Sequence, residues 1–467
     1  MRSRLVQAVV GGGLILIIAG CGGDPAADKI REAARTGLDW YADRQNGGGW
    51  ATRYSTDLQI QWGEWRPVIP EIVTVQPPGT PVVGEVFLLA HRVLGDEKYL
   101  ETAKRAGDLL VAGQQPNGGF PYELWLSPDG PRPVKQTVRM GPPEIREVWG
   151  SLEDGVTDAP IGFLLHLFDA GGDSSYFKAA VRGADFMVAA QYESGAWPQI
   201  YPPGKGGYSK FYTLNDGVVN DTVCRLLEVY HRTGDRRYLD SAIRGGKWLV
   251  SAQLSGPTYG WAEQYSLDMS PAPARAFEAA SMSPRAVGWA METLMALHLE
   301  TGNESWLEPI PKVLAWLETA QISQNIWVVQ YDVETGEPIY LTRDGQRATD
   351  PSLMNEHDML RWWTGEMGLP KFVRAWRQLQ ALGRERYMAE REKGLGGLEL
   401  ADERDRIRRH ALAALESQRP EGYWIEGGVI SSRAFALAVG DLLTYLSAKR
   451  EVIPPCDVCP GRRWYRY

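Results

Sequence analysis

Two short stretches of this sequence place carboxylates in the same local pattern. They read SLEDGV at 151–156 and TLNDGV at 213–218, and each runs into apolar residues at helical spacing. We therefore expect Glu153, Asp154 and Asp216 at the starts of two helices. Acids there can simply satisfy free backbone N–H groups. Three of them in matched positions also suit a calcium ion, which prefers carboxylate and carbonyl oxygens.

A third stretch adds positive charge further along the chain, before another predicted helix. It reads PAPARAFEAASMSPRAVGW and contains Arg275 and Arg285, with Glu278 between them. Arginines bind carboxylates through paired hydrogen bonds. An arginine pair in register with three acids indicates a cation site beside an anion site.

Aromatic residues crowd the loops between these stretches. The chain has 18 Trp and 20 Tyr, more than a helical core needs. Large planar side chains can cover the apolar face of a sugar ring, whereas packing at the end of a helical barrel accounts for about half of them. The sugar-binding candidates are Trp197, Tyr201, Tyr208 and Trp261. The loop at 62–65 either closes the binding cleft or only packs.

The elements that must position these loops recur along the chain. Six times an amphipathic segment ends in a Gln, and a Gly-rich turn then leads to an aromatic residue. The turns are Gln45–Trp50, Gln115–Phe120, Gln191–Trp197, Gln253–Trp261, Gln321–Trp327 and Gln418–Trp424. Each Gln closes one predicted helix, and a second apolar helix precedes that helix. The pattern predicts an all-α fold, an α/α toroid of about six helical hairpins.

Strands should be few and short, confined to the loops after the Gln turns. An open solenoid is the alternative that the periodicity leaves open. The charged segment 366–410 departs from the repeat and is interpreted as an irregular, partly exposed helical insertion. In a closed array the loops that lead into the inner helices emerge at one end, so the acids, arginines and aromatics should face one shallow cleft.

The N-terminus resembles an export signal. Two arginines precede a short apolar run, and Ile18-Ala19-Gly20-Cys21 resembles a lipobox, in which Cys21 becomes the lipidated N-terminus. We expect an exported lipoprotein, membrane-anchored on the periplasmic or cell-surface side; a plain secretory signal is the alternative. The predicted boundaries are 1–21 for the signal, 22–39 for a linker and the start of the first helix, 40–450 for the toroid and 451–467 for a Pro- and Cys-containing tail.

Net charge limits the partners. The formal charge of −8 argues against nucleic acid, and Lys and Arg form no dedicated basic stripe. An acidic polymer could be bound only through local cations.

Five motifs together resemble a known family, the pectate lyases of polysaccharide lyase family 10. In order they are SLEDGVTDAPIGFLLHLF, GAWPQIYP, YTLNDGVVN, ARAFE and LTRDG, and the likeness runs from about 147 to 347. The resemblance implies a helical toroid that cleaves an acidic polysaccharide, polygalacturonate or a related uronate, by calcium-assisted β-elimination. It implies that Asp216 and Glu153 hold calcium, that Arg275 is the catalytic base and that Arg343 grips a substrate carboxylate.

Two positions depart from the family pattern. Glu153 stands where the family has Asp, and Trp327-Val328-Val329 lacks the arginine of a Trp-Ala-Arg motif. One carboxylate-binding arm is therefore missing, which implies a different uronate, a shorter or esterified chain, or lost activity.

Other functions fit the same residues. A surface lipoprotein could bind glycans without cleaving them. An α/α-barrel glycoside hydrolase could use Glu153 or Asp154 with Asp216 as its acid and base. The Gln turns also resemble the repeats of triterpene cyclases, but the Asp-x-Asp-Asp acid motif of those enzymes is absent.

Overall fold

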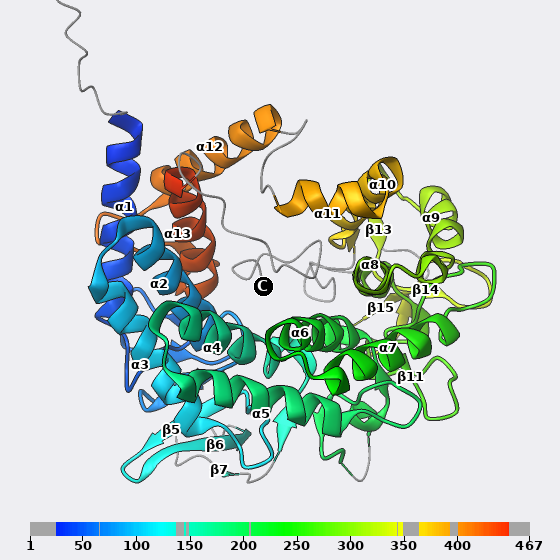
Figure 1. The fold of residues 1–467 in the computed structure, drawn as a ribbon, viewed down its shortest axis with the longest axis horizontal. Helices are drawn as coiled ribbons and strands as arrows, with labels where there is room; N and C mark the ends of the chain where they lie inside the picture. The colour runs from blue at the N-terminus through cyan, green and yellow to red at the C-terminus, as the bar shows by residue number, and fades with distance from the viewer. Residues whose placement is uncertain are drawn as a thin grey trace, which may run out of the picture.

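The computed structural model of this protein describes residues 25–64, 66–136, 144–145, 149–204, 207–342, 344–348, 364–392 and 400–447. Helices dominate this part of the chain, and Figure 1 shows them in two layers around a common centre. Solved structures with the same α/α-toroid fold, described below with the site, bear out the predicted fold class. No helix within the described ranges has the length and apolar content needed to cross a membrane.

The helices alternate between an outer and an inner layer. The outer helices are α1 (Pro25–Ala42), α3 (Glu97–Gly113), α5 (Ser174–Ala190), α7 (Arg236–Ser251), α9 (Ile310–Thr319) and α12 (Leu400–Ser417). The inner helices are α2 (Thr80–Leu94), α4 (Asp158–Gly171), α6 (Val218–Thr233), α8 (Pro284–Thr301), α10 (Leu369–Leu382) and α13 (Ser432–Ser447), and α11 (Arg384–Glu392) follows α10. The chain runs from each of the inner helices α2, α4, α6 and α8 into the outer helix that follows it, so the repeat predicted from the Gln spacing is a pair of helices.

One part of the predicted layout is wrong. The segment 366–410 is not an irregular insertion, because α10 buries Leu369, Phe372, Ala375 and Leu379 in the main core and packs against α8. The many charged residues of segment 366–410 lie on the other face of α10 and in α11. They made the apolar stripe of α10 difficult to recognise in the sequence. The first helix begins at Pro25, within the segment 22–39 that was predicted to contain a linker and the start of this helix.

Sharp breaks separate each inner helix from the outer helix that follows. Gly234 ends α6 in the left-handed conformation, with φ at 70°, and Asp235 caps α7 by accepting a hydrogen bond from the Arg237 N–H at 2.9 Å. A glycine adopts this conformation without a steric penalty, and an aspartate satisfies a free N–H. The same glycine-then-cap pair recurs at Gly95-Asp96, Gly172-Asp173 and Gly302-Asn303.

The Gln turns connect neighbouring hairpins. Gln191 Nε2 donates to Gly195 O at 2.8 Å within its own turn and to Ser241 O at 2.9 Å in α7, the next outer helix. Trp197 closes the turn by donating from Nε1 to Met187 O at 2.8 Å. Gln45, Gln114, Gln253 and Gln418 make the same two bonds. The equivalent residue in the second turn is thus Gln114, not Gln115 as predicted.

The glycine in these turns has no room for a side chain. Gly195 has φ at 100°, and a Cβ there would lie 2.4 Å from Arg244 O in α7. Gly48, Gly118 and Gly422 approach the following outer helix in the same way. Close contact between turn and helix explains why the repeat keeps a glycine at this position.

The first and last helical repeats of the described chain contact each other. Gln418 Nε2 donates to Ala33 O in α1 at 2.8 Å, and Ser432 Oγ donates to Ala51 O at 2.8 Å. Strand β19 (Val429–Ser431) pairs with β1 (Arg53–Tyr54), while α12 and α13 pack against α1. An open solenoid would leave its first and last repeats apart, so these contacts favour the toroid.

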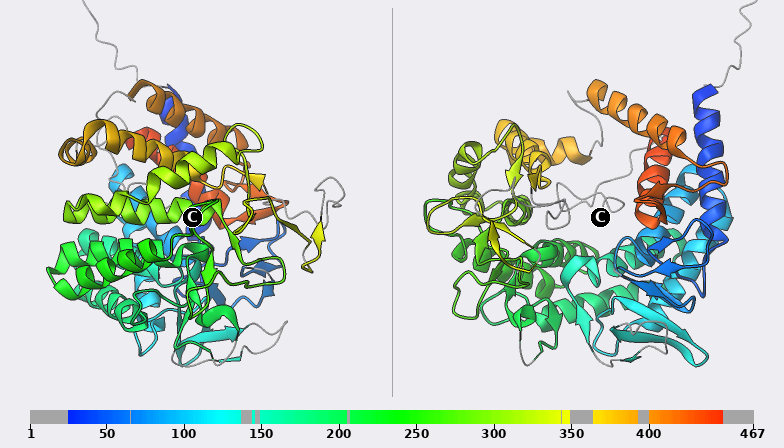
Figure 2. Two further views of the ribbon diagram at one scale, coloured as in Figure 1. Left: turned by 90° about the vertical axis from the view of Figure 1, so that its right-hand side faces the viewer. Right: turned by 180° about the vertical axis from the view of Figure 1, so that it is seen from behind.

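The strands are mostly two residues long and gather at one end of the helices (Figure 2). One sheet contains β18 (Ile425–Glu426), β19, β1, β2 (Gln61–Trp62) and β3 (Pro67–Val68), and another contains β4 (Ile72–Thr74), β5 (Glu123–Ser127), β6 (Gly130–Gln136) and β7 (Glu144–Ile145). The paired strands that remain are β8 (Gly150–Ser151) with β9 (Ile200–Tyr201), β10 (Tyr212–Thr213) with β11 (Gln264–Tyr265), β12 (Ser281–Met282) with β14 (Tyr331–Asp332), β13 (Trp327–Val328) with β17 (Thr364–Gly365) and β15 (Tyr340–Leu341) with β16 (Arg347–Ala348).

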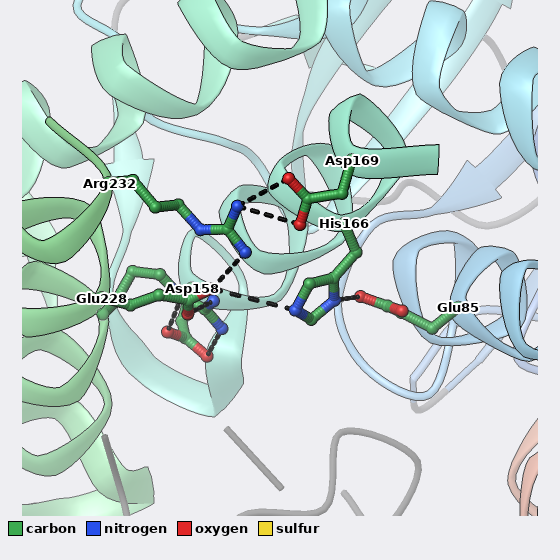
Figure 3. Close-up of polar contacts among 7 residues, drawn as sticks. Glu85, Asp158, His166, Asp169, Glu228 and Arg232 are labelled. Atoms are coloured by element: carbon green, nitrogen blue, oxygen red, sulfur yellow. Dashed lines mark hydrogen bonds and ion pairs between the residues drawn. The ribbon is translucent and has the colours of Figure 1, made fainter. Parts of the chain in front are cut away.

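Three consecutive inner helices share a charged network (Figure 3). His166 of α4 lies between Glu85 of α2, at 2.5 Å from Nδ1, and Glu228 of α6, at 3.8 Å from Nε2. Arg225 contacts both Glu228 and Asp158, and its Nε lies 2.9 Å from the Asp158 carboxylate. Because each buried charge has an opposite partner, the network can span the inner layer at modest net cost.

The network should make stability depend on pH. Burial lowers the pKa of His166, but the charge and hydrogen bond of Glu85 and the charge of Glu228 raise it more, so the net shift is upward. A histidine with a raised folded pKa stabilises the protein fully below its unfolded pKa of about 6.5, and this contribution is lost as the pH rises through the folded pKa. We expect the free energy of unfolding of wild type to exceed that of His166→Gln most at low pH. Urea titrations from pH 5 to 9 measure it, and a difference that stays constant with pH would contradict this role.

Candidate active site

Two turns with the same backbone conformation carry the three predicted acids. They are the short helices η1 (Glu153–Gly155), which leads into α4, and η3 (Asn215–Gly217), which leads into α6. Asp154 has φ 53° and ψ 23°, and Asp216 has φ 52° and ψ 27°. Both are left-handed conformations that cost an L-residue energy, although Asp tolerates them better than most. Strain repeated at matched acids is typical of functional positions.

Side chains from earlier in the chain hold two of these acids. The Tyr122 hydroxyl donates to the Glu153 carboxylate and accepts a hydrogen bond from Ser151 Oγ at 3.1 Å. Gln76 Nε2 donates to Asp154 Oδ2 at 3.0 Å. Both carboxylates are therefore fixed by neutral donors rather than by arginine or lysine.

The acids lie close enough to disfavour each other's charge. Burial first, and then the charge of Asp216, raises the pKa of Glu153 to about 7. Burial raises the pKa of Asp216 to about 6, although the charge of Arg275 opposes this shift. The pKa of Asp154 rises well above its usual range because the residue is buried and lies near the charges of Asp216 and Glu153. A bound cation would offset all three effects.

The donor set has the chemistry that calcium prefers. Besides three carboxylates it includes Gln76 Oε1, which is buried and accepts no hydrogen bond. Amide and carboxylate oxygens are calcium ligands, and an unpaired buried oxygen costs free energy unless a partner reaches it. Across the ranges that the structure describes, no three His, Cys, Asp or Glu side chains already converge as a metal would require. The residue types fit calcium, and binding would draw the oxygens together.

Arg275 faces these acids as a firmly protonated cation. Its Nε and Nη2 donate to Glu278 Oε2 and Oε1 at 2.9 and 2.7 Å, and Nη2 lies 3.9 Å from Asp216 Oδ2. Burial lowers the pKa of Arg275, but the hydrogen bonds and charge of Glu278 and the charge of Asp216 raise it more, so the net shift is upward. A catalytic base needs the opposite shift, so the arrangement seen here neutralises acids instead.

Arg285 and Glu263 form the other side of the acid cluster. The charge of Arg285 lowers the pKa of both Asp216 and Glu263, although burial, the larger effect, raises the pKa of Glu263 to about 7. Glu263 accepts a hydrogen bond from Ser283 Oγ at 2.7 Å, and its backbone carbonyl accepts from the N–H groups of Leu214 and Asn215. Glu263, directly before β11, therefore holds the start of η3 in place, a role that the sequence analysis missed.

The four predicted sugar-binding aromatics separate into two groups. Tyr208 is half-buried beside the acids, since burial raises its pKa while Arg275 lowers it and Glu153 raises it. Tyr201 packs edge-on against Phe186 in the scaffold. The prediction is wrong for Trp197 and Trp261: both are 0% exposed and donate to backbone carbonyls at helix ends, so neither presents a face to a sugar.

Some predicted residues lie elsewhere. Arg343 and the lipidation candidate Cys21 are outside the described residues. Val329, which replaces the family arginine, is 2% exposed and packs with Ile339 and Leu341 in a small apolar cluster. The side chain at this position is therefore apolar and enclosed, and it cannot pair with a substrate carboxylate.

The first third of the chain also contributes to the site. The charge of Glu64 raises the pKa of all three acids, so Glu64 of the predicted loop lies near them. Neither Gln76 nor Tyr122 was predicted, because each stands in a repeat that lacks the acidic motif. Tyr122 lies two residues after Phe120 of the second Gln turn, and Gln199 lies at the same distance after Trp197 of the third, so no repeated tyrosine marked this position.

One segment of the chain matches a known protein family. Residues 140–325 match the family model described as pectic acid lyase, which confirms the resemblance over that segment. No curated protein matches the chain.

Solved structures resemble the fold. A mutant of the family 10 polysaccharide lyase from Cellvibrio cellulosa, in complex with trigalacturonic acid, has a TM-score of 0.48 at 22% identity, covering 65% of this chain and 98% of that one. A heparin-specific unsaturated glucuronyl hydrolase has a TM-score of 0.51 at 12% identity over 92% and 99% of the two chains. A D-mannose isomerase has a TM-score of 0.50 at 14% identity over 90% and 97%. At these identities the last two bear on the fold alone.

Replacing Asp216 with Asn should stabilise the protein when calcium is absent. The folded-state pKa of Asp216 is raised, so its charge costs stability at pH 7, and Asn tolerates the left-handed backbone equally well. We expect Asp216→Asn to raise the free energy of unfolding by about 1–3 kcal/mol in urea titrations with a chelator. Asp235→Asn at the start of α7 is the control and should give no gain. A loss of stability in Asp216→Asn would refute the electrostatic account.

Proposed function

We propose that this protein is a lyase that cleaves an acidic, uronate-containing polysaccharide by calcium-assisted β-elimination. One observation carries the proposal: the segment that matches the pectic acid lyases supplies Glu153, Asp154, Asp216 and Arg275, and these residues meet at one end of the toroid. The solved lyase complex with trigalacturonic acid supports an acidic substrate. Polygalacturonate is the first substrate to test.

The acids and arginines would divide the work of binding and proton removal. Calcium, when bound by Asp216, Glu153 and Asp154, supplies the positive charge that makes the C5 proton of a uronate more acidic. Arg285 lies beside Asp216 and can neutralise a substrate carboxylate. Tyr208, half-buried beside the acids, would pack against the sugar.

Arg275 is proposed as the base. It would take the C5 proton, the C–H electrons would form the C4–C5 double bond, and the C4–O bond would break toward the leaving sugar. The guanidinium must first lose a proton to solvent, and the two hydrogen bonds that it donates to Glu278 oppose that loss. This pairing also holds the guanidine face in one orientation.

A second function has specific support. Val329 occupies the position of a family arginine and is buried, and Arg275 is held protonated. A protein with one carboxylate-binding arm missing and its base paired to Glu278 could bind a polyuronate without cleaving it. This candidate is a glycan-binding surface protein.

We also propose that the protein is exported and anchored through Cys21. The lipobox-like run before Cys21 supports this. In an expressing bacterium, wild-type protein should partition into the detergent phase of a Triton X-114 extract, and Cys21→Ser should shift it to the aqueous phase. Equal partitioning of both proteins would rule out the anchor.

The lyase activity is tested with purified protein and polygalacturonate. Elimination leaves an unsaturated product, so ultraviolet absorbance should rise with calcium and stop when a chelator is added. Arg275→Ala should lower kcat/KM by about 10²–10⁴-fold, the usual contribution of a general base. The matched control is Arg237→Ala, since Arg237 is also paired with a carboxylate but lies on outer helix α7.

The other functions give different results in the same assay. New reducing ends without absorbance would identify a hydrolase. Retardation of the protein in a polyuronate gel, with neither product, would identify a binding protein. Either outcome would overturn the lyase proposal for that substrate.

A further inference from the structure

Two residues that precede the matched segment 140–325 reach into the acid cluster. Gln76 follows β4 and is 4% exposed, and Tyr122 precedes β5. Their backbones are joined, because Tyr122 O accepts hydrogen bonds from Val75 N and Gln76 N at 2.8 and 3.1 Å. They therefore form one rigid unit against which the acidic turn η1 is held.

The two halves of the Gln76 amide have different surroundings. Its Nε2 donates to Asp154 at 3.0 Å, whereas its Oε1 is buried and has no hydrogen-bond partner. The backbone keeps the side chain there, since Gln76 O accepts from Gly79 N at 2.8 Å in a tight turn that starts α2. An amide oxygen that is buried and unsatisfied costs stability, which a hard cation beside Asp154 would recover.

Tyr122 acts on the neighbouring acid. Its hydroxyl donates to Glu153, its other hydroxyl contact is Ser151 Oγ, and its ring packs on Trp149 with centroids 5.7 Å apart. A carboxylate held by a hydroxyl that is itself hydrogen-bonded has one orientation rather than several. Such outer contacts commonly determine metal affinity as strongly as a ligand does.

We propose that Gln76 and Tyr122 complete the cation site from the first third of the chain. Gln76 orients Asp154 and supplies its unpaired amide oxygen as a calcium ligand, and Tyr122 is a positioning residue for Glu153. This rests on the proposed function, because it concerns the calcium site of that reaction. It implies that segment 140–325 alone does not hold a complete site.

Calcium affinity of the full-length protein, measured by isothermal titration calorimetry without substrate, tests the proposal. Gln76→Leu and Tyr122→Phe should each raise the Kd for calcium about 10–100-fold. Tyr238→Phe is the matched control, because the Tyr238 hydroxyl donates to the Asp185 carboxylate at 2.9 Å away from the acid cluster, and it should leave the Kd unchanged.

Thermal unfolding with a chelator separates a calcium role from a structural one. Gln76→Leu loses the hydrogen bond to Asp154 but also removes a buried oxygen that has no partner, so the two effects offset each other and its Tm without calcium should stay close to that of wild type. A lower Tm together with an unchanged Kd would assign Gln76 a structural role and overturn the proposal. So would calcium binding by both variants that equals wild type.

The outcomes also separate this inference from the lyase itself. If the variants weaken calcium binding but no uronate is cleaved, the site stands and the proposed reaction fails. If uronate is cleaved and the variants bind calcium normally, the reaction stands and this inference fails. A wild-type protein that binds no calcium overturns this inference whether or not it cleaves uronate.

Discussion

The glutamine that bridges successive hairpins is the contact on which the rest of the architecture depends. Gln191 joins its own turn to α7 through two carbonyls, and Gln418 makes the same link back to α1, 385 residues earlier. Because one side-chain amide is hydrogen-bonded both to its own turn and to the next outer helix, the rise and rotation from one repeat to the next are determined by local contacts. Every loop that enters an inner helix then emerges at the same end, and that end becomes the site.

The repeated architecture also places similar acidic side chains in successive repeats. The turns η1 and η3 share a left-handed Asp followed by a left-handed Gly, so Asp154 and Asp216 arrive in equivalent positions on adjacent inner helices. Direct packing of these consecutive repeats brings the two acids within range of each other's charge. The cost is visible in the raised pKa of both acids, and the proposed cation would offset it.

Much of this could be predicted from the sequence, because the signals were periodic. The Gln spacing predicted the hairpins, and the doubled Leu-x-Asp-Gly pattern predicted that Asp154 and Asp216 would be equivalent. Single residues could not be assigned in this way. Trp197 and Trp261 were predicted to pack against sugars. Both are buried instead, because packing of the Gln turn against the next helix needs a large side chain at this position. Gln76 and Tyr122 belong to no local motif. They lie 78 and 31 residues in sequence from Asp154 and Glu153, and only the folded protein brings them into contact with these acids.

The arginine at the centre illustrates how the same ring can bind or react. Glu278 and Asp216 together stabilise the protonated form of Arg275, so the protein without a cation is arranged to attract anions rather than to remove protons. A calcium ion held by Asp216 would withdraw one of these two stabilising carboxylates, and a substrate carboxylate would compete for the guanidinium. The pKa of Arg275 therefore depends on occupancy of the neighbouring cation site, which couples metal binding to the state of the proposed base. On this argument, affinity for calcium and reactivity of the arginine are two consequences of one cluster of carboxylates.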